Sequence, residues 1–113
     1  MLSDKVRIQH ISEAIRKIED FTKAESEDSF EENELVQSAV ERQLEIIGEA
    51  ANHLSESFKM AYPEMEWNKL RAFRNIIAHE YFGISTKIVW TSVQQRIPQL
   101  KEIVNRILDN NEL

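Results

Sequence analysis

A short run near the middle of the chain holds the side chains best suited to chemistry. Arg74 is followed at once by Asn75 and, five positions on, by His79. A guanidinium can hold a phosphate by two parallel hydrogen bonds, and an imidazole titrates near neutral pH and can move protons. An amide can orient either group. These parts suffice for metal-independent RNA cleavage, in which the ribose 2′-hydroxyl attacks its own phosphodiester.

The same residues also allow an ordinary structural interpretation. Arg74 can pair with an acid, and His79 can stabilise a helix end, where a cation is favourable. On a helical wheel Arg74 and His79 lie about 140° apart. They act together only through the long arginine side chain, a distorted helix end or a second subunit. Arg71 lies about 40° from Asn75 and adds a cation to that side. Composition and spacing leave both interpretations open.

No other pattern points to a catalytic or cofactor site. His10 and His53 have no second histidine at i+3 or i+4, and no cluster of His, Asp and Glu has metal-ligand spacing. The two glycines, Gly48 and Gly83, are far apart, so no Gly-rich loop can hold a nucleotide. We therefore expect neither a metal ion nor another cofactor.

The elements that position these residues are expected to be helices. Only two glycines and two prolines occur in 113 residues, and apolar residues recur at steps of three and four. This periodicity predicts helices over about residues 3–24, 30–60, 66–82 and 85–113. Pro98 should kink the last helix or split it in two. The sequence predicts one all-α domain over residues 1–113, an up-and-down bundle of four to five helices.

The second predicted helix carries two further expectations. Two possible capping boxes, Asp28 with Glu31 and Ser29 with Glu32, place its start inside an acidic run. An apolar stripe that begins at Leu35 follows it. At ~1.5 Å per residue, about thirty residues span about 45 Å, which is long for a compact domain of this size. The length and the wide apolar face suggest a symmetric dimer.

Charge is unevenly distributed along the chain. The net charge of −6 argues, taken whole, against tight binding to nucleic acid. Residues 25–34, however, hold six acids and no Lys or Arg, whereas residues 67–79 hold three cations and no acid. A local basic site therefore remains possible. The acidic run is either a contact site for a basic partner or a solvated loop and helix start.

Three absences bear on location. The chain has no cysteine, which excludes disulfides and suits a reducing cytoplasm. No apolar run approaches the ~20 residues of a membrane span. The first ten residues lack the apolar core of a signal peptide. We expect a cytoplasmic protein that does not enter a membrane.

At the central run the sequence resembles a known family. Residues 74–81, RNIIAHEY, fit the Arg-x4-His-x-Tyr signature of the HEPN superfamily, specifically of HepT-like toxins. Residues 42–51, RQLEIIGEAA, look like the family's second helix, and the segments at 89–90 and 97–100 are similar too. The resemblance covers about residues 35–105.

The resemblance implies an activity and partners. HepT-like proteins are all-helical dimers that act as ribonuclease toxins of toxin–antitoxin pairs of type II or VII. The similarity makes Arg74 and His79 catalytic at a dimer cleft, with Asn75 as polar support. The usual antitoxin is a small nucleotidyltransferase. In some pairs it transfers AMP to the motif tyrosine, which is Tyr81 here.

A second function stays open at this point. The chain could be a non-catalytic helical partner that binds a nucleotidyltransferase, with the motif as a docking or modification site. Its overall acidity favours this alternative slightly. Tyr81 can equally be a core-edge aromatic residue whose hydroxyl points outward.

Overall fold

The computed structural model describes residues 2–78 and 86–111, with residues 74–78 described by their backbone alone. Every regular element in these ranges is a helix, which confirms the all-α prediction. The helices are α1 (Asp4–Thr22), α2 (Glu27–Glu31), α3 (Glu34–Asn52), α4 (Glu56–Ala61), α5 (Trp67–Ala78) and α6 (Thr86–Asp109). Four of them are long and two are short, because the second predicted helix is broken.

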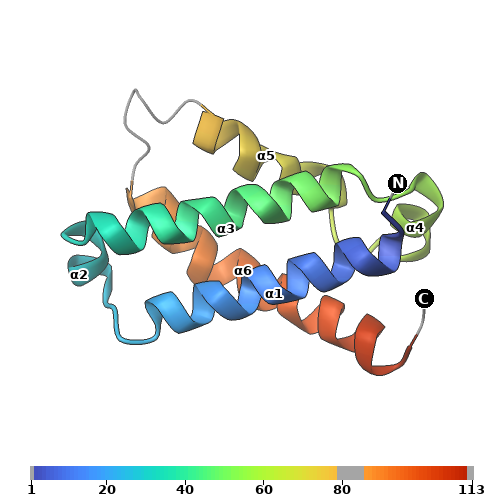
Figure 1. Cartoon of the computed structure of the whole chain (residues 1–113), viewed down its shortest axis with the longest axis horizontal. Coiled ribbons are helices and arrows are strands. Elements are labelled where there is room, and N and C mark those ends of the chain that lie inside the picture. The colour runs from blue at the N-terminus through green and yellow to red at the C-terminus, as the bar shows by residue number, and fades with distance from the viewer. Residues whose placement is uncertain (1, 79–85, 112–113) are drawn as a thin grey trace.

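The long helices surround one core (Figure 1). α3 is central and packs along α1 on one side and α5 on the other, and α6 packs against α1 and α2. The short helices lie at opposite ends of α3, α2 before its start and α4 after its end. The principal extents are 40 × 27 × 23 Å, the shape of a short bundle.

The prediction of a single helix over residues 30–60 is wrong. α3 ends at Asn52, and Ser55 starts α4 by accepting a hydrogen bond from the backbone N–H of Phe58 at 3.1 Å. Ser55 also donates to the carboxylate of Asp4, from its backbone N–H at 2.9 Å and its hydroxyl at 2.6 Å. A long-range contact thus fixes the break. The length argument for a second subunit fails with the long helix.

The start of the acidic helix also differs from prediction. The boxes that pair Asp28 with Glu31 and Ser29 with Glu32 are not formed. Instead Ser26 accepts from the backbone N–H of Ser29 at 3.1 Å, and the Ser29 hydroxyl accepts from the backbone N–H of Ser26 at 2.8 Å. A serine hydroxyl is short and both donates and accepts, so two serines complete the reciprocal pair without a glutamate.

Pro98 does not split the last helix, because α6 runs through it without interruption. The pyrrolidine ring removes one backbone donor and leaves the carbonyl of Gln94 without that bond. Both residues are exposed, so water can satisfy this carbonyl. The neighbouring Ile97 and Leu100 stay buried, and their packing holds the helix together.

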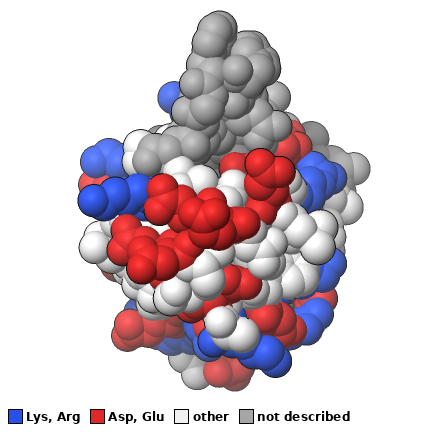
Figure 2. Space-filling model, turned by 90° about the vertical axis from the view of Figure 1, so that its left-hand side faces the viewer, with Lys and Arg blue, Asp and Glu red and all other residues white. Residues whose placement is uncertain are grey.

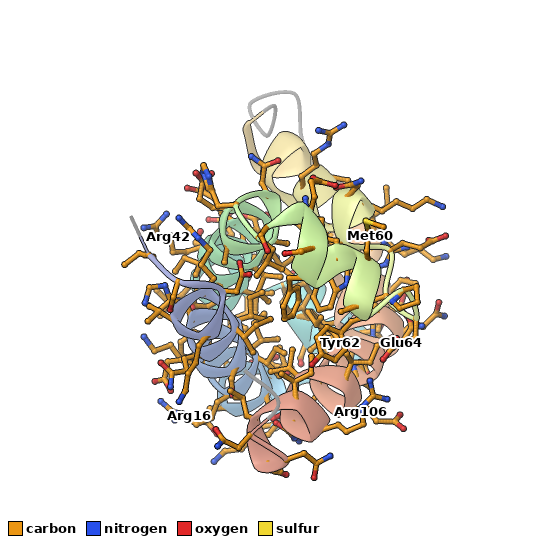
Figure 3. All side chains as sticks on the ribbon, turned by 90° about the vertical axis from the view of Figure 1, so that its right-hand side faces the viewer. Arg16, Arg42, Met60, Tyr62, Glu64 and Arg106 are labelled. Atoms are coloured by element: carbon orange, nitrogen blue, oxygen red, sulfur yellow. The ribbon has the colours of Figure 1, made fainter. Side chains whose placement is uncertain are left out.

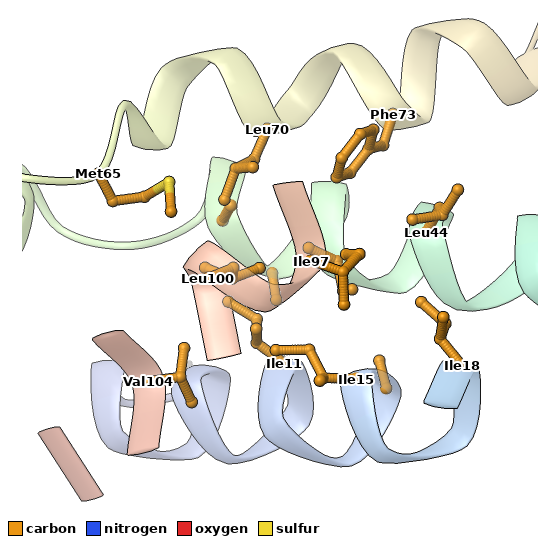
Figure 4. Close-up of a cluster of buried hydrophobic side chains, with 14 of the residues drawn as sticks. Ile11, Ile15, Ile18, Leu44, Met65, Leu70, Phe73, Ile97, Leu100 and Val104 are labelled. Carbon is orange, nitrogen blue, oxygen red and sulfur yellow. The ribbon is translucent and has the colours of Figure 1, made fainter. Parts of the chain in front are cut away.

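The core consists of the apolar stripes that the periodicity predicts. Figure 4 shows α1, α3, α5 and α6 each contributing side chains to one cluster. Its fully buried members include Ile8, Ile11, Ile18, Ile47, Leu70, Ile97, Leu100 and Ile107. Leu35 is an exception, since 81% of it is exposed. No helix within the described ranges is both long and apolar enough to cross a membrane.

Candidate active site

The start of α5 is firmly anchored. The indole N–H of Trp67 donates to the carbonyl of Tyr62 at 2.8 Å, and its ring meets the ring of Phe58 edge-on with centroids 5.4 Å apart. The Lys59 ammonium donates to the Asn68 side-chain oxygen at 3.0 Å. These contacts come from α4 and the segment after it. Because the chain turns after α3, α4 and the residue after it contact the start of the helix that carries the motif.

The inner face of α5 packs against α3. Leu70 and Phe73 are buried, as the helical wheel predicts. In α3, Gly48, Ala50 and Ala51 are buried as well. Small side chains permit the close approach of helices, and α3 packs closely against both α1 and α5.

The outer flank of α5 carries the first part of the motif. Arg71, Arg74 and Asn75 lie at i, i+3 and i+4 of the helical backbone and therefore fall within a sector of about 100°. Arg74 is at the edge of this sector, about 40° from the buried Leu70. The Arg71 side chain is exposed, and those of Arg74 and Asn75 are not described. His79 and Tyr81 lie outside the described residues. The helical backbone places three of the five predicted site residues near one another, and the roles of all five remain predictions.

Charges near this flank differ in how they are used. Lys69 forms an ion pair with Glu66 at 3.0 Å, in which both side chains are well exposed. Arg71 has neither a hydrogen bond nor an ion pair with any described residue. An exposed guanidinium without an acid partner keeps all five of its donors available for an anion. Of the two cations of α5 whose side chains are described, Arg71 has more donors available for a phosphate than Lys69, which is paired with Glu66.

The other histidines have ordinary surface positions. His10 is exposed on α1, and the His53 imidazole lies 3.0 Å from the Glu49 carboxylate on the surface of α3. Over residues 2–78 and 86–111, no group of three or more His, Asp or Glu residues is arranged to hold a metal ion.

The acidic run borders the beginning of α6. Figure 2 shows acidic side chains gathered on the end of the molecule where α2 lies. Glu27 and Glu31 of α2 line a hollow of about 190 Å³ together with Thr86 and Lys87 of α6. The acids are thus next to the described residues that follow the motif. The acids of α2 therefore lie beside Lys87 at the start of α6.

A clear pKa shift occurs behind α5. A hydrogen bond from the Arg106 guanidinium lowers the pKa of the Glu64 carboxyl below its usual value. Figure 3 shows the two side chains together at one end of the bundle. Glu64 precedes α5 and Arg106 lies in the last turns of α6, so this ion pair joins the segment before α5 to α6 and does not involve the motif residues.

Sequence reasoning missed one polar surface. Thr91, Ser92, Gln95, Arg96 and Gln99 line a hollow of about 260 Å³ along one flank of α6. The sequence contains a signal for it, since no acid occurs in α6 before Glu102. The apolar residues of the same stretch recur at steps of three and four, and this stronger pattern predicts a core helix without indicating a polar surface.

Comparisons with known proteins point to one family. The family model described as "Ribonuclease HepT-like" matches residues 11–107, which is most of the chain. No solved structure matches the chain significantly.

Several curated relatives carry ribonuclease names. The chain is 38% identical over 99 residues to a probable ribonuclease HepT of Thermococcus cleftensis, a match that covers 88% of this chain and 90% of the relative. It is 39% identical over 100 residues to a putative RNase, MJ0127, of Methanocaldococcus jannaschii, covering 88% and 83% of the two chains.

One relative is a longer protein. The chain is 37% identical over 105 residues to a gamma-glutamylcyclotransferase and putative RNase, MJ0434, of the same archaeon. The match covers 93% of this chain but spans only 47% of that relative, about half of its length.

Proposed function

The chain belongs to the HepT-like ribonuclease family, and on that premise we propose that it is a toxin that cleaves RNA without a metal ion. Arg74 and His79 are the proposed catalytic residues, with Asn75 and Arg71 in support. The observation that carries this proposal is the outer flank of α5, where Arg71, Arg74 and Asn75 fall within a sector of about 100° of an anchored helix. His79 comes next after Ala78 in the sequence and lies outside the described residues.

The proposed reaction needs only these side chains. The 2′-oxygen of a ribose attacks the adjacent phosphorus while the bond from phosphorus to the 5′-oxygen of the next nucleotide breaks. His79 acts as the general base that accepts the 2′-hydroxyl proton, or as the general acid that protonates the leaving oxygen. Arg74 stabilises the added negative charge of the phosphorane. The products carry a 2′,3′-cyclic phosphate and a 5′-hydroxyl.

A homodimer would complete this site. One imidazole performs one proton transfer at a time, and Arg74 and His79 lie about 140° apart on an ideal helix. A second copy of the outer flank across a two-fold axis supplies both groups again. The absence of any acid partner for Arg71 among the described residues agrees with an anion-binding cleft.

Control of the activity is proposed to come from a nucleotidyltransferase antitoxin. Transfer of AMP to the Tyr81 hydroxyl would place a phosphate and a nucleoside close to His79 and would block RNA by charge and bulk. Mass spectrometry of the protein co-expressed with this partner should find an added AMP that Tyr81→Phe removes. An inactive but unmodified complex would mean neutralisation by binding alone.

The direct test is RNA cleavage by the purified protein in EDTA. We expect His79→Ala and Arg74→Ala to lose about 10²–10³-fold or more of the rate. Lys69→Ala is the matched control on the same helix, because its charge is already paired with Glu66, and it should retain the activity. Growth arrest on expression should follow the same order. Full activity of the His79→Ala protein would refute the catalytic assignment.

A non-catalytic role is the second candidate. The acidic surface of α2 beside the start of α6 favours it, because such a surface fits a basic protein better than RNA (Figure 2). In this case the protein would bind a nucleotidyltransferase stably and cleave no RNA. Replacing Glu27 and Glu31 by Gln would then weaken the complex, whereas the ribonuclease proposal expects cleavage to persist.

A further inference from the structure

The net charge of −6 is the sum of a positive segment and a strongly negative remainder of the chain. Residues 67–101 contain six Lys and Arg and a single acid, Glu80, so this stretch carries a net charge of +5. The remaining residues carry −11. The positive stretch comprises α5, the connection after it and the first two-thirds of α6. In an acidic protein, a continuous stretch without acids is the place where an anion meets least repulsion.

α6 presents two different flanks to its surroundings. Trp90, Gln94 and Lys101 lie on the flank that meets α1, where the Lys101 ammonium binds the Glu19 carboxylate at 2.8 Å. The hollow described above, with Arg96 and its polar neighbours, lies about 150° round the helix. α6 packs against α1 and α2, so this polar flank turns away from α1.

Arg96 is the charged residue that lines this hollow, and no acid of the described part of the chain pairs with it. It is half-buried, yet it has no hydrogen bond and no ion pair with any described residue. Arg16 and Arg42, by contrast, pair with Glu13 and Glu45 on their own helices at 2.5 and 2.7 Å. Partial burial of a guanidinium without a counter-ion costs free energy unless an anion binds there.

The neighbours of Arg96 suit a phosphodiester. Thr91, Ser92, Gln95 and Gln99 offer hydroxyl and amide donors and no negative charge. Neutral donors around one guanidinium are typical of contacts that hold a nucleic-acid backbone without reading its bases. The end of α5 and the beginning of α6 lie at the same end of the molecule (Figure 1). One RNA strand could therefore contact both helices.

We propose that this polar flank, with Arg96 at its centre, is a second RNA-binding surface that holds the phosphate backbone next to the cleaved bond. The inference rests on the proposed function, since it extends the same RNA site from α5 to α6. Arg96 is an RNA-contact residue in this proposal and takes no part in proton transfer. Together with Arg71 it compensates for the acidity of the rest of the chain.

The test measures RNA binding separately from cleavage. The probe is a short, fluorescently labelled single-stranded RNA with 2′-O-methyl groups, which cannot be cleaved by attack of the 2′-oxygen. We expect Arg96→Gln to weaken binding about tenfold at low salt. The salt dependence of log K should also become less steep by about 0.7 per protomer.

Two further variants control this measurement. Arg106→Gln removes the same charge from the same helix, but its guanidinium is paired with Glu64, so it should bind RNA like the wild type. Arg96→Lys keeps the charge and should recover most of the lost affinity. Dimer mass by light scattering and helix content by circular dichroism should be unchanged in all three variants.

The outcomes separate the two proposals. If the wild type binds no RNA, the proposed function fails and this inference fails with it. If the wild type binds and Arg96→Gln matches Arg106→Gln, only the inference is wrong. Loss of the dimer in Arg96→Gln, or loss of a nucleotidyltransferase complex with RNA affinity unchanged, would assign the flank to a protein contact and overturn the inference.

Discussion

The two parts of α6 use their cations in opposite ways. In the second part, Lys101 binds Glu19 of α1, and Arg106 binds Glu64 before α5. In the first part, Arg96 has no partner among the described residues, although it is more buried than Arg106. The paired cations join helices that are distant in sequence. Cations of the same helix therefore differ in whether an acid of another segment lies within reach. Those with such an acid form an ion pair that joins two segments, and Arg96 can bind a ligand instead.

The first test compares the two sides of α5. Leu70 is fully buried against α3, so Leu70→Ala should lower the free energy of unfolding by about 2–5 kcal/mol through lost burial and the remaining cavity. Chemical denaturation followed by circular dichroism measures this change. Ala72→Ser, an exposed position on the same helix, should change stability by less than about 0.5 kcal/mol. Equal effects would contradict the packing of α5.

The second test compares a long-range polar contact with a local one. Asp4→Ala removes the carboxylate that accepts two hydrogen bonds from Ser55 and should cost about 1–2 kcal/mol of stability. Asp20→Ala removes an exposed ion pair with Arg16 and should cost about 0.5 kcal/mol or less. Thermal unfolding measures both. If Asp20→Ala is the more damaging of the two, the fixed break after α3 is not important for stability.

The third test asks whether Arg71 of α5 behaves like Arg96 of α6, since neither has an acid partner within residues 2–78 and 86–111. Arg71→Gln should weaken binding of the non-cleavable RNA about threefold, because an exposed guanidinium contributes less than a half-buried one. Its stability should stay within about 0.5 kcal/mol of the wild type. Lys69→Gln should change RNA affinity less than Arg71→Gln does, since Lys69 is paired with Glu66.

The smallest expected effect concerns the pair at the end of α6. The pKa of Glu64 is lowered in the folded protein, so this pair stabilises the fold at neutral pH. The contribution is lost as pH falls below the ordinary value of 4.5, when the carboxyl becomes protonated. Arg106→Gln should therefore cost about 0.5 kcal/mol at pH 7 and almost nothing in strong acid. A cost that does not depend on pH would exclude the ion pair as its source.

Much of the fold could be predicted because apolar periodicity decides which faces are buried. The stripes through Ile11, Ile97 and Leu100 were predicted and are buried. The breaks were not predicted, because they depend on contacts between distant residues. Ser55 ends one helix pattern and starts another partly through Asp4, which lies 51 positions away. Helix-capping and periodicity patterns consider only neighbouring residues, so they cannot predict a contact between Ser55 and Asp4.

The candidate site was predictable only on α5. Its wheel separates Leu70 and Phe73 from Arg71, and the structure has the same separation. Arg74, Asn75, His79 and Tyr81 remain sequence predictions in their side-chain roles. Arg96 was not predicted, since the absence of acids before Glu102 was less evident than the apolar stripe of the same helix. Its importance depends on which acids lie near it in space.

The contact between Lys101 and Glu19 also has a consequence for synthesis. The two residues are 82 positions apart, so at roughly 5–20 residues per second a ribosome makes the second about 4–16 s after the first. By the end of that interval α1, α3 and α5 have been synthesised, but the face that α6 covers is still open. The proposed RNA surface is incomplete for the same time. A nascent chain therefore passes through a period in which α1, α3 and α5 are made but their contacts with α6 are not yet formed.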